Sequence, residues 1–266
     1  MNDQLMNDQF MSDQWRALAT RIIENGDEVY ALCPVKCGKL KVSSGKLVCC
    51  DPFSGMDKTG NPYIDIPRGD HEVVVTVATL NPEKPYKSYR NAYASLIIDE
   101  TLTETKRKDL LPFLAGGVPA AELEGDDVYV FEVDAGTACF VDAQAVEEGM
   151  PEEYEWYNLF DNDTDDGCWF DLLDDSDHIH EGIANVRLPE AGDNSNLIMF
   201  QSGWGDGVYS IVGGYDDQDR LAAIHIDFGI LPDEDGLSPE IEEAAVQIES
   251  DDSTPEEKKR PWWKFW

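Results

Sequence analysis

The stretch His71-Glu-Val-Val-Val-Thr-Val-Ala-Thr-Leu80 decides the fold class. Valine and threonine are branched at Cβ and favour extended backbone, so we predict a strand over these residues. A second strand is expected over Tyr93 to Asp99, after the proline-containing stretch 82–85. Because a short connection joins antiparallel neighbours, the two strands are predicted to form an antiparallel pair.

Further strands are expected on both sides of this pair, in short apolar runs bounded by turn residues. They fall at 126–134, 139–142, 197–201, 208–212 and 221–228, and two more flank a hairpin-like break within 40–48. Most separations are too short for a helix to cross over between parallel strands. We therefore predict an α+β fold, mainly antiparallel β-sheet with a few helices, in a single globular domain.

The helical part of the prediction is small. Apolar side chains recur at helical spacing at Trp15, Leu18, Ala19, Ile22 and Ile23. This spacing predicts one amphipathic helix from Ser12 to about Gly26, and a short helix with a loop is expected within 144–181. The predicted layout is a flexible N-terminal extension (1–11), the globular α+β domain (12–231), an acidic linker (232–257) and a basic-aromatic tail (258–266).

Acidic residues dominate the composition. The 266 residues include 55 Asp and Glu against 20 Lys and Arg, so the formal net charge is −35 at pH 7. Attraction to phosphates needs a basic surface, which excludes nucleic acid as a partner of the globular domain. An anionic membrane also repels such a charge. With 42% hydrophobic residues, the chain still has enough apolar surface for a folded core.

No targeting or membrane signal is visible in the sequence. The N-terminus lacks a basic segment followed by an apolar one, and no apolar run approaches the roughly 18 residues of a membrane helix. We therefore expect a cytoplasmic location, where the six cysteines stay reduced. The cations and aromatic side chains of the tail 258–266 predict weak membrane contact but no stable insertion.

Five stretches spread along the predicted globular domain carry distinctive motifs. They are Ser44-Gly45-Lys46-Leu47-Val48 with Asp51-Pro52; Arg90-Asn91-Ala92-Tyr93-Ala94; the run from Val133 to Asp142; the run from Ser202 to Tyr209; and Asp227-Phe228. Together they resemble the bacterial family known as domain of unknown function 4241. The resemblance implies a bacterial, intracellular single domain with no established activity. Some members of that family lie near toxin systems, so the resemblance makes an immunity role an expectation.

The cysteines raise the question of a zinc site. Cys33 and Cys37 have the spacing of one half of a zinc ribbon. The adjacent Cys49 and Cys50 do not fit the other half, because neighbouring strand residues point to opposite faces. We expect partly buried thiols and no metal or cofactor.

Two other segments contain possible metal ligands. Asp177-His178-Ile179-His180 places two imidazoles on one face of an extended segment, with no third ligand at a known spacing. The acidic run Asp161–Gly167 has the composition of a calcium loop. An EF-hand needs Gly and Glu at the positions that Asp166 and Leu172 occupy, so only weak and irregular calcium binding stays open.

An enzyme remains the alternative class. The segment from Asp134 to Cys139 offers a carboxylate, a hydroxyl and a thiol, but a cysteine nucleophile needs a base, for which His225 is the candidate. The structural alternative is a turn in which Asp134 and Thr137 bond backbone groups. The glycine-rich run 202–207 is predicted to be a turn with Trp204 packed beside it. An enzyme or metal-dependent ligand-binding protein would use Asp134, Cys139, His178, His180 or Asp206.

The charge distribution gives the leading functional hypothesis. Residues 121–190 contain 22 acidic side chains and one basic side chain, Arg187, with aromatic residues interleaved. Acidic surfaces with aromatic anchors attract basic proteins. We therefore expect a non-enzymatic immunity or inhibitor protein that neutralises a basic toxin by electrostatic occlusion; an acidic housekeeping module is a second alternative. The predicted partner-binding residues are Glu152, Glu153, Glu155, Trp156, Tyr157, Asp161, Asp163, Asp165, Asp166, Trp169, Asp171, Asp174, Asp175 and Asp177.

Overall fold

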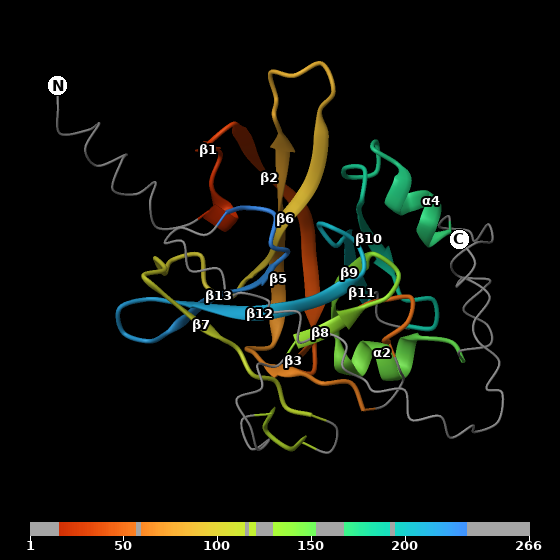
Figure 1. Ribbon diagram of the computed structural model, residues 1–266. Coiled ribbons are helices and arrows are strands. Elements are labelled where there is room, and N and C mark those ends of the chain that lie inside the picture. The colour runs from red at the N-terminus through yellow and green to blue at the C-terminus, as the bar shows by residue number, and fades with distance from the viewer. Residues whose placement is uncertain are drawn as a thin grey trace, which may run out of the picture. The chain divides into compact units, whose positions relative to one another are not determined.

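The valine-rich stretch forms the middle of β5 (Gly69–Leu80), which pairs antiparallel with β6 (Ser88–Ile97) as predicted. The computed structural model describes residues 16–56, 60–114, 117–120, 130–152, 168–191 and 195–232 (Figure 1). Both strands are buried along most of their length, because a sheet neighbour flanks each of them and a second sheet covers them.

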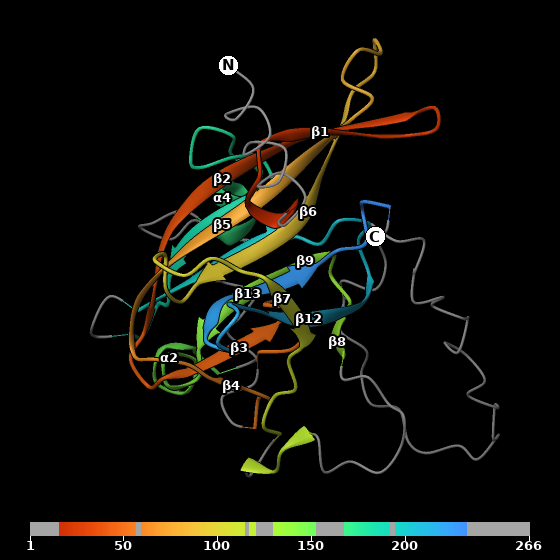
Figure 2. The same cartoon turned by 90° about the vertical axis from the view of Figure 1, so that its left-hand side faces the viewer.

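The first sheet continues outward from this pair. Its order is β1-β2-β5-β6-β13-β12-β7, and β8 also pairs with β12; every pairing is antiparallel. Figure 2 shows its long strands β2, β5 and β6 lying alongside one another. The remaining strands are β1 (Arg21–Asn25), β2 (Glu28–Val42), β7 (Lys106–Asp109), β8 (Val130–Val133), β12 (Gly207–Tyr215) and β13 (Leu221–Asp227).

A second antiparallel sheet packs against the first. Its order is β10-β11-β9-β3-β4. The strands are β3 (Lys46–Cys50), β4 (Ile64–Asp65), β9 (Thr137–Asp142), β10 (Ile183–Arg187) and β11 (Asn196–Gln201). The α-helices α2 (Ala143–Gly149) and α4 (Trp169–Asp174) lie on this side of the molecule, with β9, β10 and β11 (Figure 1). The predicted α+β class, mainly antiparallel sheet with few helices, is confirmed.

The second sheet is buried on both faces, and strand alternation divides its side chains between two clusters. In β9, Phe140 points into the cluster shared with the first sheet, whereas Val141 points into the cluster beneath the helices. In β3, Cys49 and Cys50 divide in the same way, which confirms that adjacent strand cysteines face opposite sides.

Two local predictions are wrong. The expected helix from Ser12 to Gly26 is only a 3-10 turn, Arg16–Leu18, followed by strand β1. Pairing with β2 imposes period-two alternation there, so Ile22 is 66% exposed while Ile23 is buried. The expected hairpin at 40–48 has its turn, but β2 and β3 on either side of it belong to different sheets.

Every described element lies within the compact unit Met1–Leu231. The predicted N-terminal extension (1–11), the acidic linker beyond Pro232, the basic-aromatic tail (258–266) and the possible calcium loop (161–167) lie outside the described residues. Among the described helices, none has both the length and the apolar character needed to cross a membrane.

Candidate functional site

Asp51, directly after β3, joins two of the motif stretches. Its Oδ1 accepts the backbone N–H of Phe53 at 2.8 Å, and its Oδ2 accepts those of Asp134 at 2.9 Å and Ala135 at 2.7 Å. Burial raises the pKa of this carboxyl group, and the backbone hydrogen bonds oppose the rise. Asp51 therefore fixes the loop between β8 and β9.

The glycine-rich turn is fastened to the same loop. The Ser202 N–H donates to the carbonyl of Gly136 at 2.9 Å, and its hydroxyl donates to the carbonyl of Gly205 at 2.7 Å. Gly203 has φ +30°, and a Cβ there would lie 2.7 Å from the Cβ of Phe228. Only glycine fits this close approach without strain. The motif stretches, far apart in sequence, thus form one continuous hydrogen-bonded framework.

Asn91 at the start of β6 connects this framework to the turn after α4. Its Nδ2 donates to the carbonyls of Gln201, at 2.8 Å, and Gly182, at 3.4 Å. These bonds bridge the first sheet to the end of β11 and to the loop before β10. Asn91 and Gln201 also line a pocket, so these bonds form part of its wall.

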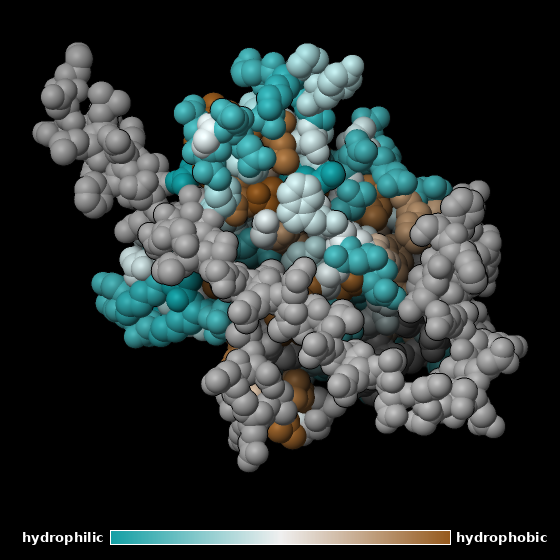
Figure 3. Space-filling model, in the orientation of Figure 1, coloured by the Kyte–Doolittle hydropathy of each residue, from teal (hydrophilic) through white to brown (hydrophobic). Residues whose placement is uncertain are grey.

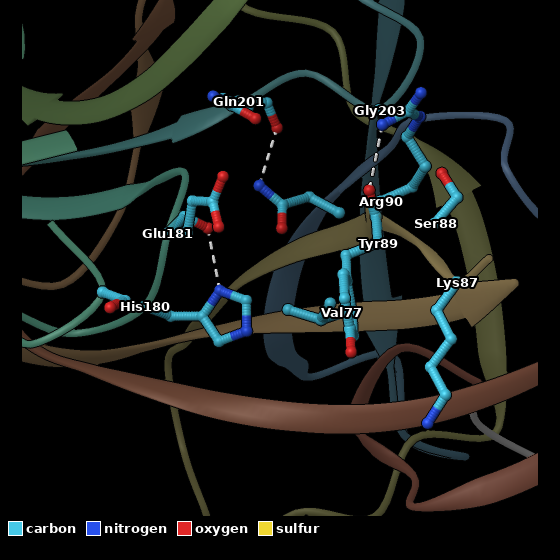
Figure 4. A pocket seen from close by; sticks show the side chains of 11 residues that line it. Val77, Lys87, Ser88, Tyr89, Arg90, His180, Glu181, Gln201 and Gly203 are labelled. Carbon is cyan, nitrogen blue, oxygen red and sulfur yellow. Dashed lines mark hydrogen bonds between the residues drawn. The ribbon is translucent and has the colours of Figure 1, made fainter. Parts of the chain in front are cut away.

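The pocket has a volume of about 530 Å³. Two walls face each other in Figure 4: one comes from the start of β6, and the other from the turn that follows α4. On the second wall, His180 Nδ1 donates a hydrogen bond to the carbonyl of Glu181 at 2.8 Å. The lining residues are Val77, Lys87, Ser88, Tyr89, Arg90, Asn91, Ser176, His180, Glu181, Gln201 and Gly203.

Trp204 lies beside the pocket and not in the core. Its side chain is 61% exposed, its Nε1 donates to the carbonyl of Gly229 at 3.3 Å, and the Arg90 guanidinium lies 5.5 Å from its ring centroid. The turn at 202–207 is confirmed, but the tryptophan presents its indole to solvent.

Five predicted partner-binding carboxylates are exposed, and four of them lie in α4 or directly after it. We call Asp171, Asp174, Asp175 and Asp177 the α4 acidic surface; Glu152 is also exposed. In Figure 3 the turn after α4 forms part of a hydrophilic region. No Lys or Arg among the described residues forms an ion pair with these four aspartates. Outside the described residues lie Glu153, Glu155, Trp156, Tyr157, Asp161, Asp163, Asp165 and Asp166.

The aromatic anchor predicted at Trp169 is not at the surface. Trp169 is 2% exposed and packs in the cluster between α4 and the second sheet, so it cannot contact a partner. Its neighbour Phe170 is 40% exposed and stacks on Phe53, with ring centroids 4.7 Å apart. The phase of the helix therefore places Phe170, one position later, beside the α4 acidic surface.

The residues of the enzyme alternative are not brought together by any described contact. The Cys139 thiol is fully buried, 3.7 Å from the Cys50 sulfur, and burial raises its pKa well above its usual value. A buried thiol of this kind is a poor nucleophile. His225, the candidate base, is bonded instead to Ser95 at 2.8 Å and Glu104 at 3.1 Å.

The histidine and cysteine residues considered as metal ligands are not grouped into a site either. His178 Nε2 accepts the Asn185 backbone N–H at 3.3 Å, and Cys33 is exposed while Cys37 is buried. Within the described ranges, no group of three or more His, Cys, Asp or Glu is placed to hold a metal ion.

Sequence reasoning missed several residues of the pocket. Glu181 and Gln201 carried no signal of their own. Arg90 and Asn91 lay in a quoted motif but received no role. The available signal was in two of the motif stretches, 90–94 and 202–209, because they supply Arg90, Asn91 and Gly203 to the pocket lining.

The fold and the site define a class: an α+β protein of two packed antiparallel sheets, with a polar pocket to which two of the motif stretches contribute Arg90, Asn91 and Gly203. Within this class, the chain belongs to the family described as Protein of unknown function (DUF4241), which matches residues 40–226. The match runs from the end of β2 into β13, so it takes in the second sheet, the pocket and the first sheet apart from β1 and most of β2. The family predicted from the motifs is confirmed. No curated protein and no solved structure matches the chain.

Proposed function

We propose that the protein is a non-catalytic, cytoplasmic binding protein that engages a basic partner protein through the α4 acidic surface. In its more specific form, the proposal makes it an immunity or inhibitor protein that occludes a basic toxin. The observation that carries the proposal is the exposure of four aspartates within seven residues, without ion pairs to described cations.

The way α4 is held supports this role. Trp169 and Leu173 are buried in the core beneath α4. Their packing fixes the position of the helix that carries the exposed carboxylates. Phe170 adds a partly exposed aromatic ring to the same surface. A partner of opposite charge is steered to such a surface, and an aromatic group supplies contact area once it arrives.

The test uses two variants of equal charge. One changes the four aspartates of the α4 acidic surface to asparagine. The control changes four other exposed aspartates, Asp27, Asp65, Asp70 and Asp217, to asparagine. The partner is isolated with the wild-type chain as bait, and its association rate is measured at low and high salt.

We expect a basic partner whose association slows about tenfold or more in the α4 variant and much less in the control. Co-expression should also restore growth to cells that carry the partner alone. Equal rates for the two variants, or a partner without a basic surface, would contradict the proposal.

A further inference from the structure

The pocket between β6 and the turn after α4 is locally basic in a strongly acidic protein. Lys87 and Arg90 line it, against the single carboxylate of Glu181, whereas the whole chain carries a formal charge of −35. A small anion is repelled by most of this molecule. Two cations at one cavity provide a local exception, since nearby charges dominate at short range.

Some hydrogen-bond donors of the Arg90 guanidinium have no partner within the described residues. Its Nη1 donates to the carbonyl of Tyr89 at 3.0 Å, which fixes one side of the guanidinium (Figure 4). Its Nε is buried and has no hydrogen-bond partner, and no described residue accepts a bond from Nη2. A buried unpartnered N–H is costly. The Nε–Nη2 edge is also the one that matches two oxygens of a carboxylate or phosphate.

Two aromatic rings flank this guanidinium. Trp204 lies over it at 5.5 Å and is 61% exposed, and Tyr89 lines the pocket and is 54% exposed. Exposed rings beside an arginine provide a stacking surface for a planar group. The cavity volume of about 530 Å³ lies in the range of small-molecule sites.

The opposite wall supplies a polar contact. Because a carbonyl only accepts, the bond from His180 to the Glu181 carbonyl places a proton on Nδ1. The other ring nitrogen, Nε2, lies on the side that faces Val77 and Tyr89 in Figure 4. This atom is placed to form a hydrogen bond with a polar group of a ligand.

We propose that this pocket binds a small organic anion, with its phosphate or carboxylate group at the guanidinium of Arg90 and its planar ring against Tyr89 and Trp204. The pocket borders the α4 acidic surface, because the lining residue Ser176 lies between Asp175 and Asp177. The anion site uses other side chains, so it goes beyond the proposed function and is tested without a partner protein.

The experiment is isothermal titration of the full chain with four probes. Adenosine 5′-monophosphate and benzoate carry a planar ring with a phosphate or a carboxylate, inorganic phosphate lacks the ring, and adenosine lacks the anion. We expect saturable one-to-one binding of at least one ringed anion, with a Kd below about 1 mM, and binding at least about tenfold weaker for adenosine and for phosphate.

Three variants locate the site. Arg90→Lys keeps the charge but loses the planar fork, and should weaken binding about tenfold or more. Trp204→Ala should weaken binding of the ringed anion and leave binding of phosphate unchanged. This variant is the test of the site if Arg90→Lys does not fold. Arg68→Lys, exposed and outside the pocket, is the control. The proposal is overturned if neither ringed anion binds, if adenosine binds equally well, or if the pocket variants match the control.

Discussion

Asp142 offers a quantitative test of how the chain changes from one sheet to the other. It ends β9, caps α2 and is 1% exposed. Its Oδ1 accepts the Ala145 N–H at 3.0 Å, and its Oδ2 accepts both the N–H of Ser44, at 2.9 Å, and its hydroxyl, at 2.7 Å. Ser44 lies in the turn between β2 and β3, so one carboxylate holds the point where the chain leaves the first sheet.

The predicted cost of Asp142→Ala follows from these three bonds. Loss of the helix cap costs about 1 kcal/mol. The two Ser44 donors lose a charged acceptor, at about 1 kcal/mol each, because Ser44 is only half-buried and water replaces part of the interaction. The free energy of unfolding should therefore fall by about 3 kcal/mol, a large part of the stability of an ordinary domain.

The assay is urea unfolding of Asp142→Ala, Ser44→Ala and the double variant. Ser44→Ala removes the hydroxyl but keeps the backbone N–H, so it should cost about 1 kcal/mol. The double variant should be more stable than the sum of the single losses implies, by about 1 kcal/mol, because the shared bond is counted twice. A loss below about 1 kcal/mol for Asp142→Ala, or strictly additive losses, would refute the reasoning.

Three further predictions concern the core, the glycine turn and pH. Burial holds the pKa of His225 below its usual 6.5, so the unfolded chain takes up the proton first as pH falls. Relative to His225→Gln, the wild type should lose stability below about pH 6.5, by up to about 1.4 kcal/mol per pH unit; equal pH slopes in urea titrations would contradict this. Gly203→Ala should cost about 1–3 kcal/mol more than Gly205→Ala, because the second position also has positive φ, +100°, but nothing within 4 Å of a new Cβ; equal unfolding midpoints would argue against the clash. Trp169→Ala should cost about 3–5 kcal/mol and Phe170→Ala much less, since only the first side chain is fully buried; the reverse order in thermal melts would mean that the helix is rotated.

Much of the fold was accessible from sequence, because the decisive strands carry their own signal. Valine-rich β5 and its neighbour β6 are such cases. β7 is different: its four residues, Lys106–Asp109, are all charged and exposed, so no apolar pattern marks it. At β1 the same apolar residues fit a helix or a strand, and only the partner strand β2 decides between them.

The candidate site was less accessible, because its geometry depends on contacts distant in sequence. Ser44 and Asp142 are 98 residues apart, and nothing near Ser44 shows that the chain turns into a second sheet. Arg90 and Trp204 likewise meet only through the framework that joins β6 to β11. The choice between Trp169 and Phe170 rested on the phase of a six-residue helix, which is too short to reveal a periodic pattern.

The order of strands in the second sheet has a consequence for synthesis on the ribosome. β3 ends at Cys50, but its neighbour β9 begins at Thr137 and β11 ends only at Gln201. At ~5–20 residues per second, the intervening stretch of about 150 residues takes roughly 8–30 s to emerge. Leu47 gains its partner Ile64 of β4 early, but Leu47 and Val48, both fully buried in the finished protein, wait for β9 and then for β11 before the second sheet is complete. The nascent chain is therefore expected to need chaperone protection early, and slower translation of residues 50–200 should lower the yield of folded protein.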